Sequence, residues 1–454
     1  MATRILSTPT TVSVFAPPSP ANWGSGSGAG TYANNLWTPG KDANGTVNLV
    51  SWNLVPLNRW VEVAGTRLDG LDSVVKAAVP GWRDYGSWDG VTNAWNGMAW
   101  DDRTGLERGW LAVSGGHSDS SNDGIYRLDL RKMAWNVQRM PQDPNWWPAS
   151  YKSSGSYTYF LPAGAYYQAN NSNEEGVYDD EFFVAGDPAH SYRTPTARHT
   201  YGSTVFVPSL GAAGKILMGC RRYWEYDLAT NAWARPKFPF DNAAGYNNPS
   251  LGAKGYTGEN MQAWFNEVEG RYYVCATQNY NSSQTWSVQP GGTGWRWEGG
   301  YPIGGYESFY TAQEKRNRTL WTLVYDIVNN RMGCPRVMLE TRLDSPRMTQ
   351  TIAVRLGASL ASAVFGVSNY WDGQAMTFVP DINKWLCNIF TDAGGMVWCW
   401  LDAGTWVLEL ANIPGASPSV TSPYIETKIK YLPDLRALVW VKTASQNVRL
   451  IRFA

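Results

Sequence analysis

The chain has little charge, little histidine and no long apolar run, and each shortage excludes a class of protein. Only 17% of its 454 residues are charged, and 38 basic side chains balance 38 acidic ones, so a basic nucleic-acid-binding surface is not indicated. No run approaches the ~18 apolar residues of a membrane-spanning helix, and the first residues lack the apolar core of a signal peptide. We expect synthesis in the cytoplasm, with no secretion signal, no membrane insertion and no nucleic-acid partner.

Cysteine is scarce and widely spread. The five cysteines are odd in number and lack the C-x-x-C spacing of zinc and redox sites: Cys220, Cys275, Cys334, Cys387 and Cys399. Each lies in or beside an apolar run that has the length of a strand. We therefore expect buried free thiols, with neither a disulfide framework nor a zinc site.

Glycine, tryptophan and tyrosine take the place of the missing charges. The chain holds 45 Gly, 25 Trp and 25 Tyr, and Gly-rich turns between aromatic strands are typical of an all-β protein. We expect most tryptophans to pack between sheets. A minority would form exposed platforms that stack on sugars or on a protein partner.

One stretch, 93–137, has the pattern of four short strands separated by turns rich in Gly, Asn and Asp. Its first junction is an aromatic residue, then a polar turn, then an apolar strand, and this junction recurs down the chain. The junctions begin at Trp100, Phe206, Phe265, Tyr310, Phe378 and Tyr431. A repeat of roughly 45–50 residues with loop insertions is typical of the blades of a β-propeller.

The last unit supplies only three strands, near 426–431, 437–441 and 448–453. A missing fourth strand would leave the ring open with an exposed edge, and the segment Arg59–Ala64 can supply it. The sequence therefore predicts a six-bladed propeller of four-stranded antiparallel blades over residues 58–454, closed by an N-terminal strand. The first five blades would begin near Asn93, Thr200, Asn260, Tyr306 and Gln374.

Residues 1–57 are rich in Pro, Ser, Gly and Asn, and such a segment buries little surface by itself. We expect an irregular N-terminal arm that becomes ordered by docking on a neighbouring protein. Its isolated aromatic residues, Trp23, Tyr32 and Trp37, would be the anchors of this assembly contact.

A long insertion, 141–195, separates the first two units. Loops of this length inside a compact fold are usually functional. The insertion holds Trp146, Trp147, Tyr166 and Tyr167, which we expect to present binding platforms at one mouth of the ring.

Several positions resemble the kelch family of β-propellers, in which a Gly-Gly doublet is followed by a spaced tyrosine and tryptophan. The matching positions are Gly115-Gly116, Tyr126 and Trp135 in the first unit, and Tyr226 and Trp233 in the second, where Gly219-Cys220 replaces the doublet. In addition, Arg198-His199 is similar to a strand-one pattern of bacterial kelch-like proteins. The resemblance covers roughly 58–454, is specific in two units, and implies a propeller that usually serves as a binding scaffold.

Catalytic chemistry has few candidates. The three histidines are His117, His190 and His199. A copper oxidase of the galactose-oxidase kind shares the kelch propeller but needs two histidines, two tyrosines and a thioether-forming cysteine, and no cysteine here stands beside a motif that would supply it. His117 and His199 fall at comparable blade ends, where we expect them, with Arg198, to serve packing or binding. No G-x-S-x-G nucleophile elbow occurs.

The loop before the third strand carries part of a calcium-binding pattern. Asp119, Ser121, Asp123 and Gly124 fall at positions one, three, five and six of that pattern. Leu130 stands where a bidentate acid is needed, and no helices flank the loop. We interpret the loop as a tight polar turn, keep Asp119 and Asp123 only as weak metal candidates, and expect no metal and no cofactor.

The sequence favours a non-enzymatic structural and binding propeller of a larger, oligomeric assembly. A leaderless chain of this composition looks like a bacteriophage virion component, such as a tail, fibre or capsid-surface protein. Its partners would be other structural proteins and a surface glycan. Two alternatives stay open: a carbohydrate-active enzyme or galactose-oxidase-like oxidase that uses His117 and His199, and a stand-alone sugar-binding lectin.

Overall fold

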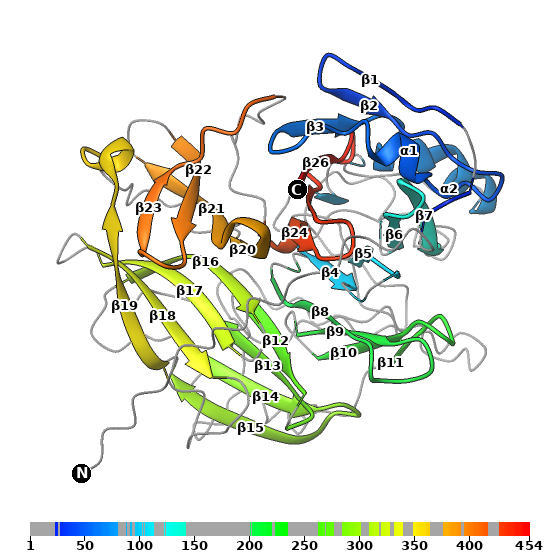
Figure 1. The fold of residues 1–454 in the computed structure, drawn as a ribbon. Coiled ribbons are helices and arrows are strands. Elements are labelled where there is room, and N and C mark those ends of the chain that lie inside the picture. The colour runs from blue at the N-terminus through cyan, green and yellow to red at the C-terminus, as the bar shows by residue number, and fades with distance from the viewer. Residues whose placement is uncertain are drawn as a thin grey trace, which may run out of the picture.

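The computed structural model describes residues 23–25, 28–79, 88, 91–92, 96–101, 103, 105–112, 122, 124–141, 200, 202–219, 223–234, 262–267, 269–276, 284–300, 308–316, 319–326, 331–338, 348–363, 376–391, 395–415 and 426–454. These residues form short strands joined by turns, with a few short helices (Figure 1). Within these ranges no helix has the length and apolar character needed to cross a membrane.

Three sheets are separate four-stranded antiparallel meanders. The first holds β4 (Met98–Asp101), β5 (Arg108–Ala112), β6 (Ile125–Asp129) and β7 (Ala134–Arg139). The second holds β8 (Thr204–Val207), β9 (Lys215–Met218), β10 (Trp224–Asp227) and β11 (Ala232–Ala234). The third holds β12 (Gln262–Asn266), β13 (Arg271–Ala276), β14 (Gln284–Gln289) and β15 (Thr293–Gly300). Each sheet follows chain order, as the strand pattern predicts.

The fourth sheet has eight strands and consists of two meanders. One is β16 (Ser308–Arg316), β17 (Thr319–Asp326), β18 (Arg331–Met338) and β19 (Met348–Leu356), and the other is β20 (Met376–Val379), β21 (Lys384–Thr391), β22 (Gly395–Asp402) and β23 (Val407–Leu410). The outer strands β19 and β23 pair in parallel, with Arg355 opposite Val407 and Leu356 opposite Leu408. The prediction of six separate blades is therefore wrong as a count of sheets, because this short ladder merges two predicted units and leaves five sheets.

The fifth sheet joins the two ends of the described chain. Its strand order is β1 (Thr31–Ala33), β2 (Leu36–Thr38), β3 (Trp60–Val63), β26 (Arg449–Arg452), β25 (Ala437–Trp440) and β24 (Ile429–Leu432). β3 pairs antiparallel with β26, with Trp60 opposite Ile451 and Val61 opposite Leu450. The predicted closing strand at 59–64 is confirmed.

The N-terminal segment, which we define as residues 28–79, is more regular than predicted. It contains β1, β2, β3, α1 (Leu49–Trp52), η2 (Leu68–Leu71) and α2 (Asp72–Ala78). Asn34 and Asn35 have φ values of 51° and 63°, the left-handed pair typical of a two-residue type I′ hairpin. β2 then pairs in parallel with β3, with Trp37 opposite Val63. The expectation of an irregular arm is therefore wrong for residues 28–57, since this hairpin adds two strands to the fifth sheet.

The sheets are arranged around a centre, toward which the strands β4, β8, β12, β16, β20 and β24 lie (Figure 1). β4 contacts β8, β8 contacts β12, β16 contacts β20, and β20 contacts β24. The helix η9 (Glu426–Lys428) before β24 contacts β4, which brings the last sheet against the first. Two other short helices, η7 (Ala358–Leu360) and η8 (Pro380–Ile382), lie in connections of the eight-stranded sheet. The fold is an all-β propeller built from small, mainly antiparallel sheets.

The core lies between neighbouring sheets, because each sheet buries both faces. The buried tryptophans are Trp23, Trp37, Trp52, Trp60, Trp88, Trp110, Trp135, Trp224, Trp233, Trp264, Trp385, Trp398 and Trp440. The kelch-type positions Tyr126 and Tyr226 are fully buried as well. For the described residues, the prediction that most tryptophans pack between sheets is confirmed.

Candidate functional site

The N-terminal segment is held together by a cluster of indole rings. The Trp37 ring lies 5.5 Å from that of Trp52, and Trp23, which precedes the segment, lies 5.0 Å from Trp52. The Trp37 indole donates to the main-chain oxygen and to the hydroxyl of Ser51 at 3.1 and 3.2 Å. Asn48 caps α1 by accepting from the Ser51 amide at 2.7 Å. The cap and the buried indole together fix the one-turn helix against the fifth sheet.

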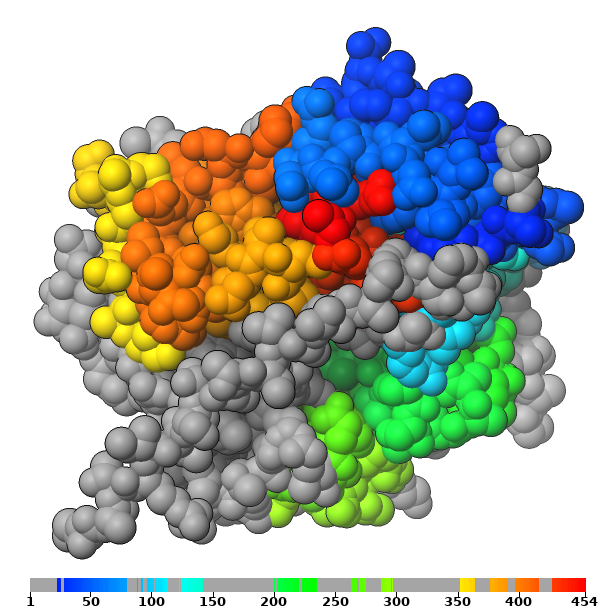
Figure 2. Space-filling model, viewed as in Figure 1, coloured from blue at the N-terminus to red at the C-terminus, as the bar shows by residue number. Residues whose placement is uncertain are grey.

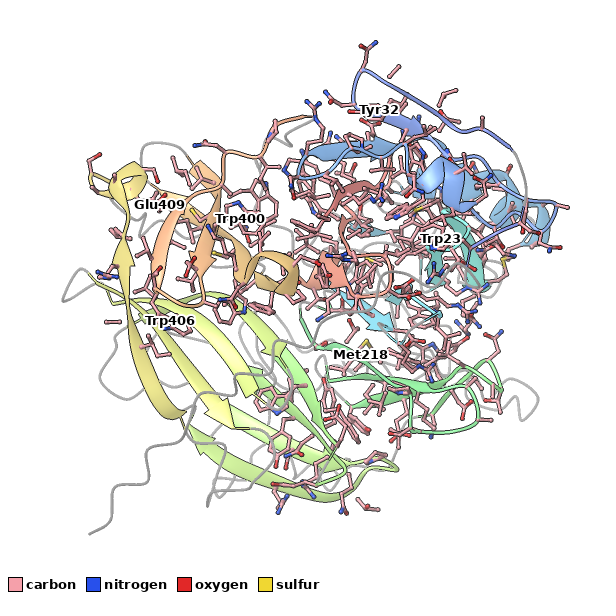
Figure 3. The ribbon with its side chains drawn as sticks, in the orientation of Figure 1. Trp23, Tyr32, Met218, Trp400, Trp406 and Glu409 are labelled. Atoms are coloured by element: carbon pink, nitrogen blue, oxygen red, sulfur yellow. The ribbon has the colours of Figure 1, made fainter. Side chains whose placement is uncertain are left out.

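Two of the three residues expected to anchor the chain on a neighbour are inside the chain itself. Trp37 is fully buried and Trp23 is 6% exposed, so neither ring is available for docking in this structure. Tyr32 is half-buried on β1, and its hydroxyl donates to Asn35 Oδ1 at 3.2 Å. Figure 3 shows Tyr32 at the outer rim of the segment and Trp23 toward the first sheet. The local composition could not reveal this burial, because the covering residues, such as Trp52 for both rings and Arg131 for Trp23, are not sequence neighbours.

Trp23 covers a buried ion cluster between the first and last sheets. The Arg131 guanidinium lies 3.0 Å from Glu107 Oε2 and also pairs with Asp434 Oδ2, and all three side chains are at most 8% exposed. The Trp23 ring lies over the guanidinium, with 5.0 Å between its centroid and Cζ. Burial lowers the pKa of Arg131, while the nearby Glu107 carboxylate raises it. No sequence pattern marks this cluster, since its members lie in three separate turns.

Threonine hydroxyls form hydrogen bonds with main-chain groups of the neighbouring inner strands. Thr427 Oγ1 accepts from the Met98 amide at 2.8 Å and donates to the Met98 carbonyl at 2.7 Å. Thr377 Oγ1 accepts from the Tyr431 amide at 3.0 Å. Thr200 Oγ1 accepts from the amide of Gly97, just before β4, at 3.1 Å. Thr200 directly follows His199, one of the predicted site residues. These hydroxyls hold the ring together, so we assign them a structural role.

Lys428 is a fully buried lysine beside this inner ring, and its ammonium donates to the main-chain oxygen of Thr92. Burial of a lysine is rare unless the charge is paired. The alternating pattern around Lys428 and Lys430 predicts a strand, but not which lysine is buried.

Two tyrosines donate to carboxylates, one within the stretch of β10 and one from β24 to η8. The Tyr223 hydroxyl lies 2.9 Å from Glu225 Oε1, and that of Tyr431 donates to Asp381. Arg436 Nε lies 2.9 Å from the same Asp381 carboxylate. Burial, and then the neighbouring carboxylate, raises the pKa of both phenols. Both phenols therefore stay protonated donors, and neither can act as a general base near neutral pH.

The surface of the N-terminal segment is apolar in several places. The exposed large apolar side chains of the described residues are Leu36 (41%), Val50 (58%), Leu54 (41%), Leu57 (45%) and Val74 (47%). All five lie in this one segment, which forms one side of the molecule in Figure 2. They lie on β2, on α1, in the chain after α1 and on α2, so apolar surface is spread over several elements of this segment.

The other predicted site residues lie outside the described residues. They are the aromatic platforms Trp146, Trp147, Tyr166 and Tyr167, the residues His117, Arg198 and His199, and the weak metal candidates Asp119 and Asp123. In the part of the chain that is described, no three His, Cys, Asp or Glu side chains are grouped as metal ligands. Cys387 and Cys399 are buried free thiols, which confirms the prediction for these two cysteines.

Comparisons with known proteins add similarity of fold only. No protein-family model and no curated protein matches the chain, so the kelch resemblance stays a prediction. Solved β-propeller structures match at low identity. A mutant of AofleA from Arthrobotrys oligospora is 8% identical over 81% of each chain, with a TM-score of 0.38. The BP39L lectin of Burkholderia pseudomallei is 11% identical over 53% of this chain and 63% of its own, with a TM-score of 0.29. TolB from Acinetobacter baumannii is 8% identical over 54% of this chain and 64% of its own, with a TM-score of 0.24. Because the identities and TM-scores are this low, we assign none of these proteins' functions to this chain.

Proposed function

We propose that the chain is a non-catalytic structural and binding propeller of a larger assembly, and that it docks on a neighbouring protein through its N-terminal segment. The observation that carries this proposal is the gathering of Leu36, Val50, Leu54, Leu57 and Val74 on that segment. Apolar side chains that a partner covers favour association roughly in proportion to the apolar area removed from water. The docking residues proposed here replace Trp23 and Trp37, which the chain already buries.

The geometry of α1 favours a docking face. Val50 lies on α1 and Leu54 in the turn that follows it, and both side chains are exposed, while Trp52 between them is buried in the core. Lys41 and Asp42 are the only charged residues between 23 and 58. A partner would therefore lose little charge hydration on binding, which suits an apolar contact.

We propose further that the ring has six blades, with the eight-stranded sheet counted as two, and that the assembly is a bacteriophage virion. The two meanders of that sheet support the blade count. The virion role rests on composition and on the resemblance to kelch-like propellers.

Replacing the docking face tests the proposal. The variant Val50→Ser/Leu54→Ser/Leu57→Ser should keep the melting temperature within a few degrees, because these side chains are exposed, yet lose incorporation of the chain into purified particles. Thr230→Ser, at an exposed position on the second sheet, is the control. Incorporation of the triple variant at the wild-type level would contradict the docking role.

Sugar binding is a second candidate, favoured by one pair of residues. Trp400 on β22 is half-buried and lies directly opposite Glu409 on β23, which is exposed. Figure 3 labels both side chains. An indole and a carboxylate at opposed positions of two strands supply a stacking surface and hydrogen-bond acceptors, which suits a saccharide. A glycan array compares wild type with Trp400→Ala and with Glu409→Gln. Binding that neither change weakens would exclude this pair as the site.

A further inference from the structure

Two arginines without ionic partners lie side by side on the first sheet. Arg108 on β5 and Arg127 on β6 are diagonal neighbours in the strand register. Diagonal neighbours are on one face of a sheet, within reach of each other when their side chains are long. Both arginines are half-buried, and the Nε atom of each is buried without an acceptor. Among the described residues, neither guanidinium has an ion-pair or hydrogen-bond partner.

The two carboxylates nearest in the register are already engaged. Asp101 on β4 and Asp129 on β6 each lie opposite Arg108. Asp101 accepts from Arg103 Nε and Nη2 at 2.8 Å each, and Asp129 Oδ1 accepts from two amides of the turn after β6. Burial, and then the nearby Arg108, lowers the pKa of Arg127, although Asp129 acts against this. Three guanidiniums and two carboxylates leave an excess of positive charge at this place.

The described strands of the second sheet supply no carboxylate to this face. Trp110, directly opposite Arg127, packs on Phe206 with 4.8 Å between ring centroids, so the face that bears the arginines is turned toward the second sheet. The register places six further side chains on the same face as Phe206: Thr204, Ile216, Met218, Trp224, Tyr226 and Trp233. The acidic residues of β10, Glu225 and Asp227, fall on the other face. The Nε1 atom of Trp110 is buried without an acceptor as well. The contact between the two sheets therefore has donors and positive charge in excess of acceptors.

We propose that Arg108 and Arg127 bind a doubly charged tetrahedral oxyanion, phosphate or sulfate, at the contact between the first and second sheets. Guanidinium groups bind such oxygens through paired N–H donors, and two of them match the charge of a dianion. The half-buried position of both side chains leaves the site open to solvent at its outer end. The anion is either a free ion or an ester group of a larger molecule, such as a sugar phosphate. The site shares no residue with the docking face and does not depend on the proposed function.

Calorimetric titration with inorganic phosphate and with sulfate, at mildly alkaline pH, tests the site. Wild type should bind both ions, and sodium chloride of equal ionic strength should give no such signal. Arg108→Gln and Arg127→Gln should each weaken phosphate binding at least ~10-fold, because each removes charge-assisted hydrogen bonds. The control variant Arg67→Gln/Lys76→Gln removes two exposed cations elsewhere and should bind phosphate like wild type. Competition by glucose 6-phosphate, with glucose as its blank, would assign the site to an ester, and its exclusion would assign the site to the free ion.

Three titration results would overturn the proposal. They are a wild type that binds neither phosphate nor sulfate, binding that survives both arginine substitutions, and an equal loss in the control variant. Melting in chloride alone is a separate check. Because neither arginine forms an ion pair among the described residues, Arg108→Gln and Arg127→Gln should melt at or above the wild-type temperature there. A large fall in melting temperature would assign the two arginines a structural role instead.

Discussion

Arg131, in the turn after β6, forms a buried ion pair with Asp434, in the turn between β24 and β25, and so joins the first sheet to the last. Glu107 pairs with the same guanidinium. Arg131→Met would leave two carboxylates buried without their cation and should cost about 3–5 kcal/mol of unfolding free energy. Urea denaturation measures this loss.

An exposed ion pair provides the matched control for Arg131. Arg67 pairs with Asp69, and its side chain is 55% exposed. Arg67→Met should cost less than ~1 kcal/mol. Equal losses in the two variants would show that the buried cluster contributes nothing beyond a surface pair.

Trp37 should determine whether the N-terminal segment stays folded. Trp37→Ala removes a fully buried ring and should destabilise the segment by about 3–5 kcal/mol. Trp37→Phe keeps most of the apolar volume but loses the two hydrogen bonds to Ser51, so a smaller loss of about 1 kcal/mol is expected. Hydrogen exchange of residues 31–38 reports the effect. Unchanged protection in Trp37→Ala would show that the hairpin does not need this ring.

Tyr226 should make the protein sensitive to alkali. Burial raises the pKa of its phenol from 10.0 to about 12. An unfolded chain releases this proton near pH 10, whereas the folded chain holds it until about pH 12. The stabilisation is therefore complete below about pH 10 and is lost as pH rises toward 12.

Tyr226→Phe cannot ionise, so its unfolding free energy should fall less steeply than that of wild type between pH 10 and 12. Losing the hydrogen bond to Asn231 would lower stability by an amount that does not vary with pH. Burial also raises the pKa of Cys399 to about 12, so Cys399→Ser should flatten the same region of the profile. Parallel profiles for wild type and Tyr226→Phe would contradict this role.

Metal content separates the scaffold from the oxidase alternative. We expect purified protein to hold neither copper nor calcium in stoichiometric amount, because the sequence lacks a cysteine placed as the cross-linked ligand of a copper oxidase. Elemental analysis after dialysis measures both ions. Copper at one equivalent, lost on His117→Ala or His199→Ala, would favour the oxidase.

The parts of the fold that repeat could be predicted from the sequence. The strand at 59–64 was assignable to the last unit because that unit lacked one strand, and β3 indeed pairs with β26. Tyr126 and Trp135 matched a spacing, and both are buried. These successes depend on patterns of neighbouring residues that recur along the chain.

Contacts between turns that are distant in the sequence could not be predicted, because no repeated sequence pattern marks them. The parallel pairing of β19 with β23 involves only two residue pairs, and no periodicity marks it. Arg131, Glu107 and Asp434 each look like an ordinary turn residue, and only the closed ring brings them together. Trp37 lies among residues typical of irregular chain, yet β3 and α1 supply its burial.

The pairing of β3 with β26 also constrains how the protein is made. β3 leaves the ribosome early, whereas β26 follows almost the whole length of the chain later. At ordinary rates of translation this interval is roughly 20 to 80 seconds. During that time the inner edge of β3 and the side of Trp60 that later packs on Trp398 and Trp440 have no partner. The nascent chain thus passes through a long, aggregation-prone stage, and a chaperone that binds apolar strands would raise the yield of folded protein.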